Sequence, residues 1–154
     1  MLHGHGVRSR QLRGPLGAEG GPETVEVEVR RYRCCACGAV LTVVPRELQP
    51  RRHYSRPAIA LALARYGLLG EPAHRVRGRL SPWQVVGRVA AGWRQLGRWI
   101  RAAARGQLLA RRPLQGSARQ VASRVATYVL AHAPPETRCG SSLVQVFAGA
   151  AAMT

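Results

Sequence analysis

The segment RYRCCACG holds three cysteines whose spacing is that of a metal-binding turn. Cys34 and Cys37 are separated by two residues and are followed by Gly38. A Cys-x-x-Cys turn places two thiolates on one ion, and zinc prefers a tetrahedron of four such ligands. A glycine suits the tight turn in which backbone amides point toward sulfur. The sequence therefore predicts one half of a zinc site.

Two interpretations account for the other half of that site. His3 and His5 lie where the first knuckle of a zinc ribbon is expected and would complete a Cys2His2 site. Alternatively the first knuckle lies before Met1, which we favour because isolated histidines near a terminus are usually solvated. Cys35 is either a spare ligand or a small buried side chain. Cys139 lies more than a hundred positions away.

A second pattern is a stripe of cations at helical spacing. Four arginines follow one another by four, three and four positions: Arg94, Arg98, Arg101 and Arg105. At about 100° per residue they form one narrow stripe on a helix. Arginine binds phosphate bidentately and contacts base edges, so the stripe predicts contact with nucleic acid. The alternative is the ordinary solvated side of an amphipathic helix.

A basic linker provides further cations. Arg51 and Arg52, in the segment PRRHYSR, are additional candidates for contact with the nucleic-acid backbone.

The charge of the chain favours a polyanionic partner. Its 154 residues include 24 Arg and no Lys, against seven Glu and no Asp, for a formal net charge of +17. Nucleic acid is the commonest polyanion that such a field attracts, and an anionic membrane or an acidic protein would also fit. An Ala-, Gly-, Pro- and Arg-rich composition is typical of GC-rich coding DNA, which explains part of the Arg content but not the shortage of acids.

Composition disfavours an enzyme. Metal-dependent cleavage of nucleic acids needs clustered carboxylates, whereas Glu26 and Glu28 alternate with valines on a predicted strand. No Lys is present for a phosphate-binding loop. No apolar run reaches the roughly 18 residues of a membrane helix, and no signal peptide is recognisable. We therefore expect a cytoplasmic protein whose clustered cysteines bind metal.

Strands are expected on both sides of the cysteine turn. The segment HGVRSRQLRG, residues 5–14, indicates an extended strand. In TVEVEVRRYR, residues 24–33, valines alternate with glutamates as in a half-buried strand. AVLTVV, residues 39–44, predicts a third strand, which Pro45 ends. A strand, a knuckle and a strand form the second half of a zinc ribbon, which we assign to residues 1–47.

Helices are expected over residues 48–112. Ser55 caps a helix that runs to about residue 68, and residues 75–79 form a basic loop. Ser81 followed by Pro82 begins the next helix. Its apolar positions are spaced by three and four: Val86, Val89, Trp93, Leu96, Ile100 and Ala103. A break near Gly92 would divide it into residues 82–90 and 93–105, which gives a helix-turn-helix outline.

The last part, residues 113–154, is also expected to be helical. A helix from Ser117 to about His132 would turn four side chains inward: Val121, Val125, Tyr128 and Val129. Residues 141–153 predict a short apolar helix. The expected fold class is α+β, with a small β zinc-ribbon-like element followed by an α-helical region.

Three segments, RYRCCACG, VPRELQPRRHYS and WRQLGRWIRAA, resemble a family of uncharacterised bacterial domains found beside insertion-sequence transposases. The likeness extends from about His3 to Ala104, and Cys34 and Cys37 match the second ligand pair of the family. It implies a zinc ribbon and a helix-turn-helix unit that binds DNA, with no catalytic domain. The sequence departs from the family where the first cysteine pair is expected.

We therefore expect a DNA-binding, transposase-related accessory or remnant protein, not an enzyme, with zinc as its candidate cofactor. Two alternatives remain open. The apolar C-terminal helices would form a protein-interaction module that packs on another chain or a second copy, or the reading frame is a remnant without function.

Overall fold

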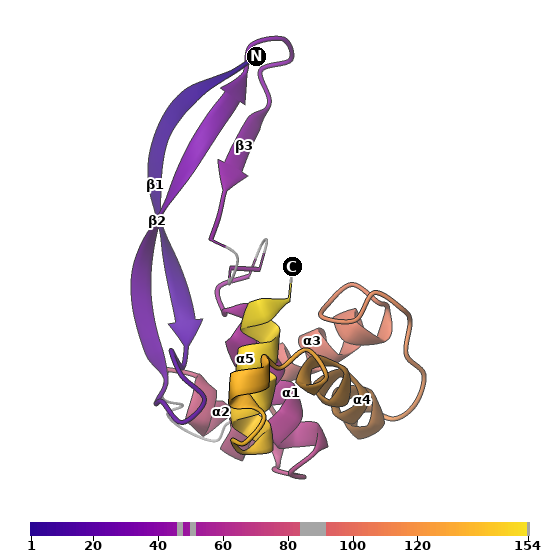
Figure 1. The fold of residues 1–154 in the computed structure, drawn as a ribbon. Helices are drawn as coiled ribbons and strands as arrows, with labels where there is room; N and C mark the ends of the chain where they lie inside the picture. Colours follow the sequence, from indigo (N-terminus) through magenta and orange to yellow (C-terminus); the bar gives the residue numbers. More distant parts are fainter. Residues whose placement is uncertain (46–47, 50–51, 84–91, 154) are drawn as a thin grey trace.

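The computed structural model describes residues 1–45, 48–49, 52–83 and 92–153. A three-stranded sheet precedes a group of helices (Figure 1). The strands are β1 (Leu2–Gly14), β2 (Glu23–Cys34) and β3 (Val40–Val43). The helices are α1 (Arg56–Gly67), α2 (Ala73–Leu80), α3 (Arg94–Ala104), α4 (Ala118–Leu130) and α5 (Ser142–Ala152), with a short 3-10 helix η1 (Pro135–Thr137). The predicted α+β class is confirmed.

The strands form a long twisted ribbon that extends away from the helices (Figure 1). β1 and β2 are antiparallel and remain paired from Leu2 opposite Cys34 to Gly14 opposite Glu23, with a register shift between Gly4 and Val7. β3 pairs only with the last part of β2, so the strand order is β1-β2-β3. All three predicted strands are confirmed.

The base of the ribbon is joined to the helices by backbone contacts. The Arg13 N–H donates to the His53 carbonyl at 2.7 Å, and the Ser55 N–H donates to the Arg13 carbonyl at 3.3 Å. Beside them Gly14 has φ +110°, and a Cβ placed there would lie 2.5 Å from the Cβ of Ala58. Only glycine allows both that backbone conformation and that close approach.

Helix α1 is the centre of the helical part. Residues 57–64 are all buried, so this helix is apolar on every side. The Ser55 hydroxyl accepts from the Ala58 N–H at 3.1 Å, which confirms the predicted cap. Helices α2, α3, α4 and α5 each contact α1. Among the described helices none combines the length and apolarity needed to cross a membrane.

Helix α3 confirms the second half of the helix predicted after Ser81. It buries Leu96, Trp99 and Ile100 against the core. Trp99 also makes edge-to-face contacts with Tyr54 and Trp93, each at 5.0 Å between ring centroids. The predicted first half, with Val86 and Val89, lies outside the described residues.

Two sequence predictions in the helical part were wrong. Residues 75–79 belong to helix α2 and are not a loop, because Val76 and Leu80 lie one turn apart and are both fully buried. Tyr128 is 42% exposed and does not join the inner face of α4. The other three predicted residues of that face, Val121, Val125 and Val129, are buried.

The two C-terminal helices agree with prediction and approach their neighbours through glycine. Ser117 and Gln120 form a capping box at the start of α4. A Cβ at Gly67 would lie 2.3 Å from the Ser123 backbone nitrogen, where α1 meets α4. A Cβ at Gly149 would lie 2.3 Å from the Val129 carbonyl, where α5 meets α4. These helices therefore pack with their backbones in direct contact.

Substitution Gly67→Ala is expected to lower the free energy of unfolding by roughly 1–3 kcal/mol, because the new methyl group must displace the α4 backbone. Gly78→Ala is the matched control, since no atom lies within 4 Å of the added Cβ. That variant should leave stability unchanged or raise it by up to about 1 kcal/mol. Urea unfolding followed by circular dichroism measures both, and equal effects of the two substitutions would contradict this packing.

Candidate nucleic-acid interface and cysteine turn

Helix α3 directs its arginines to solvent. All four predicted residues are exposed: Arg94, Arg98 and Arg101 lie on α3 and Arg105 is the C-cap residue directly after it, and the four are called the arginines of α3. At about 100° per residue they fall within about 60° of one another around the helix axis. Leu96 and Trp99, on the opposite side, are buried in the core. The helix thus has one apolar face and one face of uniform positive charge.

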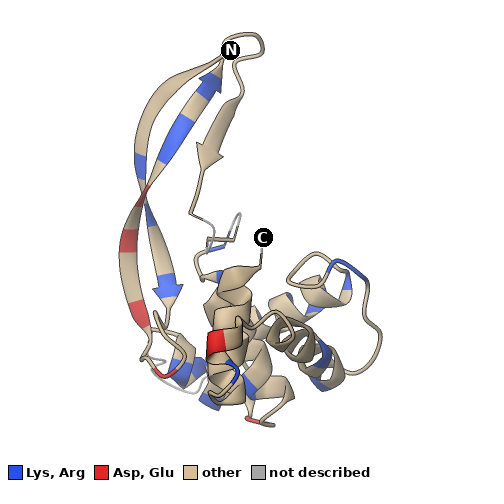
Figure 2. Cartoon of the chain, viewed as in Figure 1, with Lys and Arg blue, Asp and Glu red and all other residues tan. Residues whose placement is uncertain are grey.

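Little negative charge is available to neutralise that face. The sequence of α3 contains no acidic residue. In the described part of the chain the only ion pair joins Arg65 and Glu71 at 2.9 Å, and neither belongs to α3. Figure 2 shows basic residues on the ribbon and the helices, whereas three of the glutamates lie on β2. The positive field of the helical surface is therefore largely uncompensated.

The linker arginines are less favourably placed. Arg51 lies outside the described residues. Arg52 is half-buried, and burial lowers the pKa of its guanidinium from the ordinary value. The Arg52 carbonyl accepts from the Arg10 side chain at 2.9 Å, which ties this segment to β1. Arg52 is therefore a weaker candidate for phosphate contact than the arginines of α3.

Trp83 is a further feature of the surface. Its side chain is 56% exposed, and the guanidinium carbon of Arg13 lies 5.3 Å from its ring centre. An exposed tryptophan beside an arginine offers a stacking surface to a nucleotide base. Trp99, by contrast, belongs to the core.

The predicted cysteine turn joins β2 to β3. The Gly38 N–H donates to the Cys34 carbonyl at 2.9 Å, and the Cys34 N–H donates to the Ala39 carbonyl at 2.8 Å. Gly38 has φ +71°, a conformation that favours glycine. The geometry is that of a tight turn with its thiols on the outside, since Cys35 and Cys37 are exposed and Cys34 is half-exposed.

Hydrogen bonds within this turn stabilise the thiolate of Cys34. The backbone N–H of Cys37 is the largest influence, followed by the backbone N–H of Ala36 and the side chain of Cys37. Together they lower the pKa of the Cys34 thiol from its ordinary value. Deprotonated sulfur is the form that binds metal and reacts with electrophiles.

Strand pairing brings one predicted histidine to the turn. His3 Nδ1 lies 3.3 Å from Cys35 Sγ, and the Cys35 N–H donates to the Met1 carbonyl at 3.0 Å. His3 therefore lies beside Cys35, which the sequence left as either a spare ligand or a small buried side chain, and not beside Cys34 or Cys37. His5 lies two residues further along β1. Within residues 1–45, 48–49, 52–83 and 92–153, no three His, Cys, Asp or Glu side chains are grouped to hold a metal ion. The four-ligand zinc site stays a prediction.

The lowered pKa of Cys34 predicts a pH-dependent reactivity. Its thiolate should form at lower pH in the folded chain than in the unfolded chain, because unfolding removes the hydrogen bonds from Cys37 and Ala36. Iodoacetamide labelling over a pH series, with and without urea, measures this when mass spectrometry assigns the modified cysteine. The half-maximal labelling rate of Cys34 should shift to higher pH in urea, and an identical midpoint in both states would contradict the turn geometry.

Comparison with known proteins finds a family match over part of the chain. Residues 1–75 match the family model of a domain of unknown function, DUF6431. This region contains the ribbon, the cysteine turn, helix α1 and the start of α2. No curated protein and no solved structure matches the chain. The match covers just under half of the 154 residues, and the arginines of α3 lie beyond it.

Proposed function

We propose that this chain is a DNA-binding protein without a catalytic domain of its own, and that helix α3 is its main contact with DNA. One observation carries the proposal: three exposed arginines on one face of α3 and Arg105 at its C-cap form one stripe, and the other face of the helix is anchored in the core. None of the four has an acidic partner among the described residues. Their positions are fixed by the buried side of the same helix.

The dimensions of the stripe suit duplex DNA. From Arg94 to Arg105 the stripe runs about 16 Å along the helix, at 1.5 Å per residue. The major groove is about 12 Å wide and admits a helix. Arginines spaced along such a helix can reach successive phosphates or base edges along the groove. The bidentate guanidinium then gives each contact a defined geometry.

The transposase-related role is the more specific part of the proposal. It is supported by the likeness of RYRCCACG and WRQLGRWIRAA to domains found beside transposases. The absence of Asp from the sequence supports an accessory role, since metal-dependent DNA cleavage needs clustered carboxylates. The protein would then bring DNA to a catalytic partner or bind it alone.

The packing of the C-terminal helices favours this proposal over a protein-interaction module. Val125 and Val129 of α4 are buried, and so is Val146 of α5. Leu143 and Phe147 pack against the same core. The apolar faces expected to receive another chain are thus occupied within this one.

Replacing the four arginines of α3 together by glutamine should weaken DNA binding by at least about a hundredfold at low salt, since each contact to phosphate is charge-assisted. The slope of log affinity against log salt concentration should become shallower by about 3 to 4. Fluorescence anisotropy on a mixed-sequence duplex over a salt series measures both quantities.

A matched control removes the same charge from other parts of the surface. Arg8, Arg30, Arg124 and Arg138 are exposed and lie outside α3. Their joint replacement by glutamine should cost much less affinity and leave most of the salt slope. Equal losses in the two variants would mean that net charge alone drives binding. No binding by the unaltered chain at any salt would end the proposal.

We further propose that Cys34 and Cys37 hold a structural zinc ion. Zinc supplies a cross-link there, and the lowered pKa of Cys34 prepares one ligand. Added zinc should slow the alkylation of Cys34 and Cys37 but not that of Cys139, which is exposed in the helical part. The variant His3→Ala/His5→Ala should lose this protection if the two histidines complete the site. Equal rates with and without zinc would rule out binding at the turn.

A further inference from the structure

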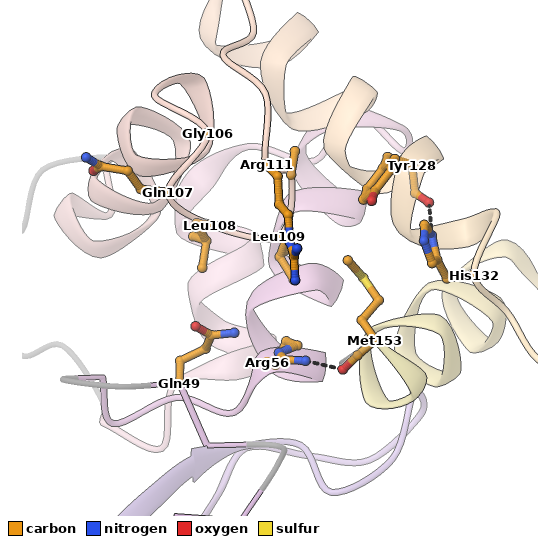
Figure 3. Close-up of a pocket in the computed structure, with 11 residues that line it drawn as sticks. Gln49, Arg56, Gly106, Gln107, Leu108, Leu109, Arg111, Tyr128, His132 and Met153 are labelled. Atoms are coloured by element: carbon orange, nitrogen blue, oxygen red, sulfur yellow. Dashed lines mark hydrogen bonds between the residues drawn. The ribbon is translucent and has the colours of Figure 1, made fainter. Parts of the chain in front are cut away.

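A second cationic site lies away from the stripe on α3. A cavity of about 510 Å³ opens between the start of α1, the loop after α3 and the C-terminal ends of α4 and α5 (Figure 3). None of the four arginines of α3 lines it. The walls come from segments that are distant in sequence, so the cavity exists only in the folded chain.

The cavity has a polar centre. Figure 3 shows the Arg111 guanidinium directed into the middle, toward Arg56. Arg56 itself donates to the Met153 carbonyl. In the described part of the chain the Arg111 side chain has no hydrogen-bond or ion-pair partner. The described lining contains no carboxylate, while Gln49 adds an amide. An anion of phosphate type therefore meets an available guanidinium there.

One wall of the cavity is aromatic. The rings of Tyr128 and His132 lie 4.6 Å apart between centroids, at an angle of 57°. A 2.9 Å contact between His132 Nδ1 and the Tyr128 carbonyl holds the imidazole in place. Both side chains are exposed, so a planar group can reach them. Tyr128 therefore lines the cavity and is not part of the inner face of α4.

The loop that carries Arg111 contains strained backbone. Leu109 has φ +61°, the only positive φ at a non-glycine residue in the described part of the chain. The Ala110 N–H donates to the Leu108 carbonyl at 2.7 Å, which closes a three-residue turn around it. A leucine in this conformation costs free energy that the surrounding structure must offset. The turn brings Leu108, Leu109 and Arg111 to the same cavity.

We propose that this cavity binds a nucleoside monophosphate, either free or at the end of a nucleic-acid strand. The phosphate meets Arg111, with the Gln49 amide beside it, and the base lies against Tyr128 and His132. The volume falls in the range of about 300–1,000 Å³ that is usual for small-molecule sites. The proposal goes beyond duplex binding by α3, since it concerns a different surface and a different ligand.

Isothermal titration calorimetry on the full chain tests the site with three probes: deoxyadenosine monophosphate, deoxyadenosine and inorganic phosphate. The monophosphate should bind more tightly than either part alone, because it uses both the cation and the aromatic wall. Equal affinity for the monophosphate and for inorganic phosphate would overturn the assignment of the wall. Absence of heat for the monophosphate would overturn the whole proposal.

Arg111→Gln should weaken the monophosphate at least about tenfold, as expected for the loss of a charge-assisted contact. Arg112→Gln is the matched control, because Arg112 is the exposed neighbour that does not line the cavity. Tyr128→Ala should weaken the monophosphate but not inorganic phosphate. Thermal unfolding verifies that each variant is folded, and Arg111→Met, which also removes the charge, replaces Arg111→Gln if it is not. Equal losses in the Arg111 and Arg112 variants would contradict the site.

Two further measurements are needed. The first distinguishes free nucleotide from strand ends as the ligand, and the second distinguishes binding in the cavity from binding on α3. If the cavity binds strand ends, a single-stranded oligonucleotide with a 5′-phosphate should compete with the monophosphate better than the same strand with a 5′-hydroxyl. If it binds only free nucleotide, the two strands should compete equally weakly. The variant without the four arginines of α3 should keep its affinity for the monophosphate. Loss of that affinity would place the ligand on α3 and overturn the separate site.

Discussion

The helical part of this protein depends on the need to cover α1 on every side. Ile59 and Leu63 lie one turn apart on one face of the helix and Leu61 lies on the opposite face, and all three are buried. Burial of each such side chain contributes roughly 1.5–3 kcal/mol, which is lost wherever the helix meets water. The alanines between them keep the helix narrow, so its neighbours approach closely. Helices α2, α3, α4 and α5 surround it as a consequence.

This arrangement determines which residues remain for function. A helix that covers α1 must turn its apolar side inward, so its polar side faces solvent. For α3 that polar side carries the arginines, and the buried aromatic contacts of Trp99 with Tyr54 and Trp93 set their rotation about the helix axis. Glycine at positions 67 and 149 brings α4 into backbone contact with both α1 and α5. The ends of α4 and α5 then meet the loop after α3 and leave the cavity that contains Arg111.

Patterns local in sequence predicted most of the secondary structure. Alternation of valine and glutamate identified β2, and capping residues identified the starts of α1 and α4, because these signals act within one turn or one strand. Helix α2 was missed, since it is short and rich in arginine and is held only by the burial of Val76 and Leu80 against distant residues. The approach of His3 to Cys35 depends on strand register, and the cavity depends on tertiary packing. Residue spacing in the sequence alone predicts neither the contact between His3 and Cys35 nor the cavity.

The ribbon has a mechanical consequence for the protein. Its cysteine turn lies about 40 Å of strand beyond Gly14, at roughly 3.4 Å per residue. Over that length β1 and β2 are supported by each other and, near the turn, by β3, and the described contacts that fix them to the segment before α1 and to α1 itself are concentrated at Arg10, Arg13 and Gly14. The ribbon therefore acts as a lever arm with its pivot at the start of α1. A force applied at the cysteine turn is delivered to the N-terminus of the helix on which the whole core is built.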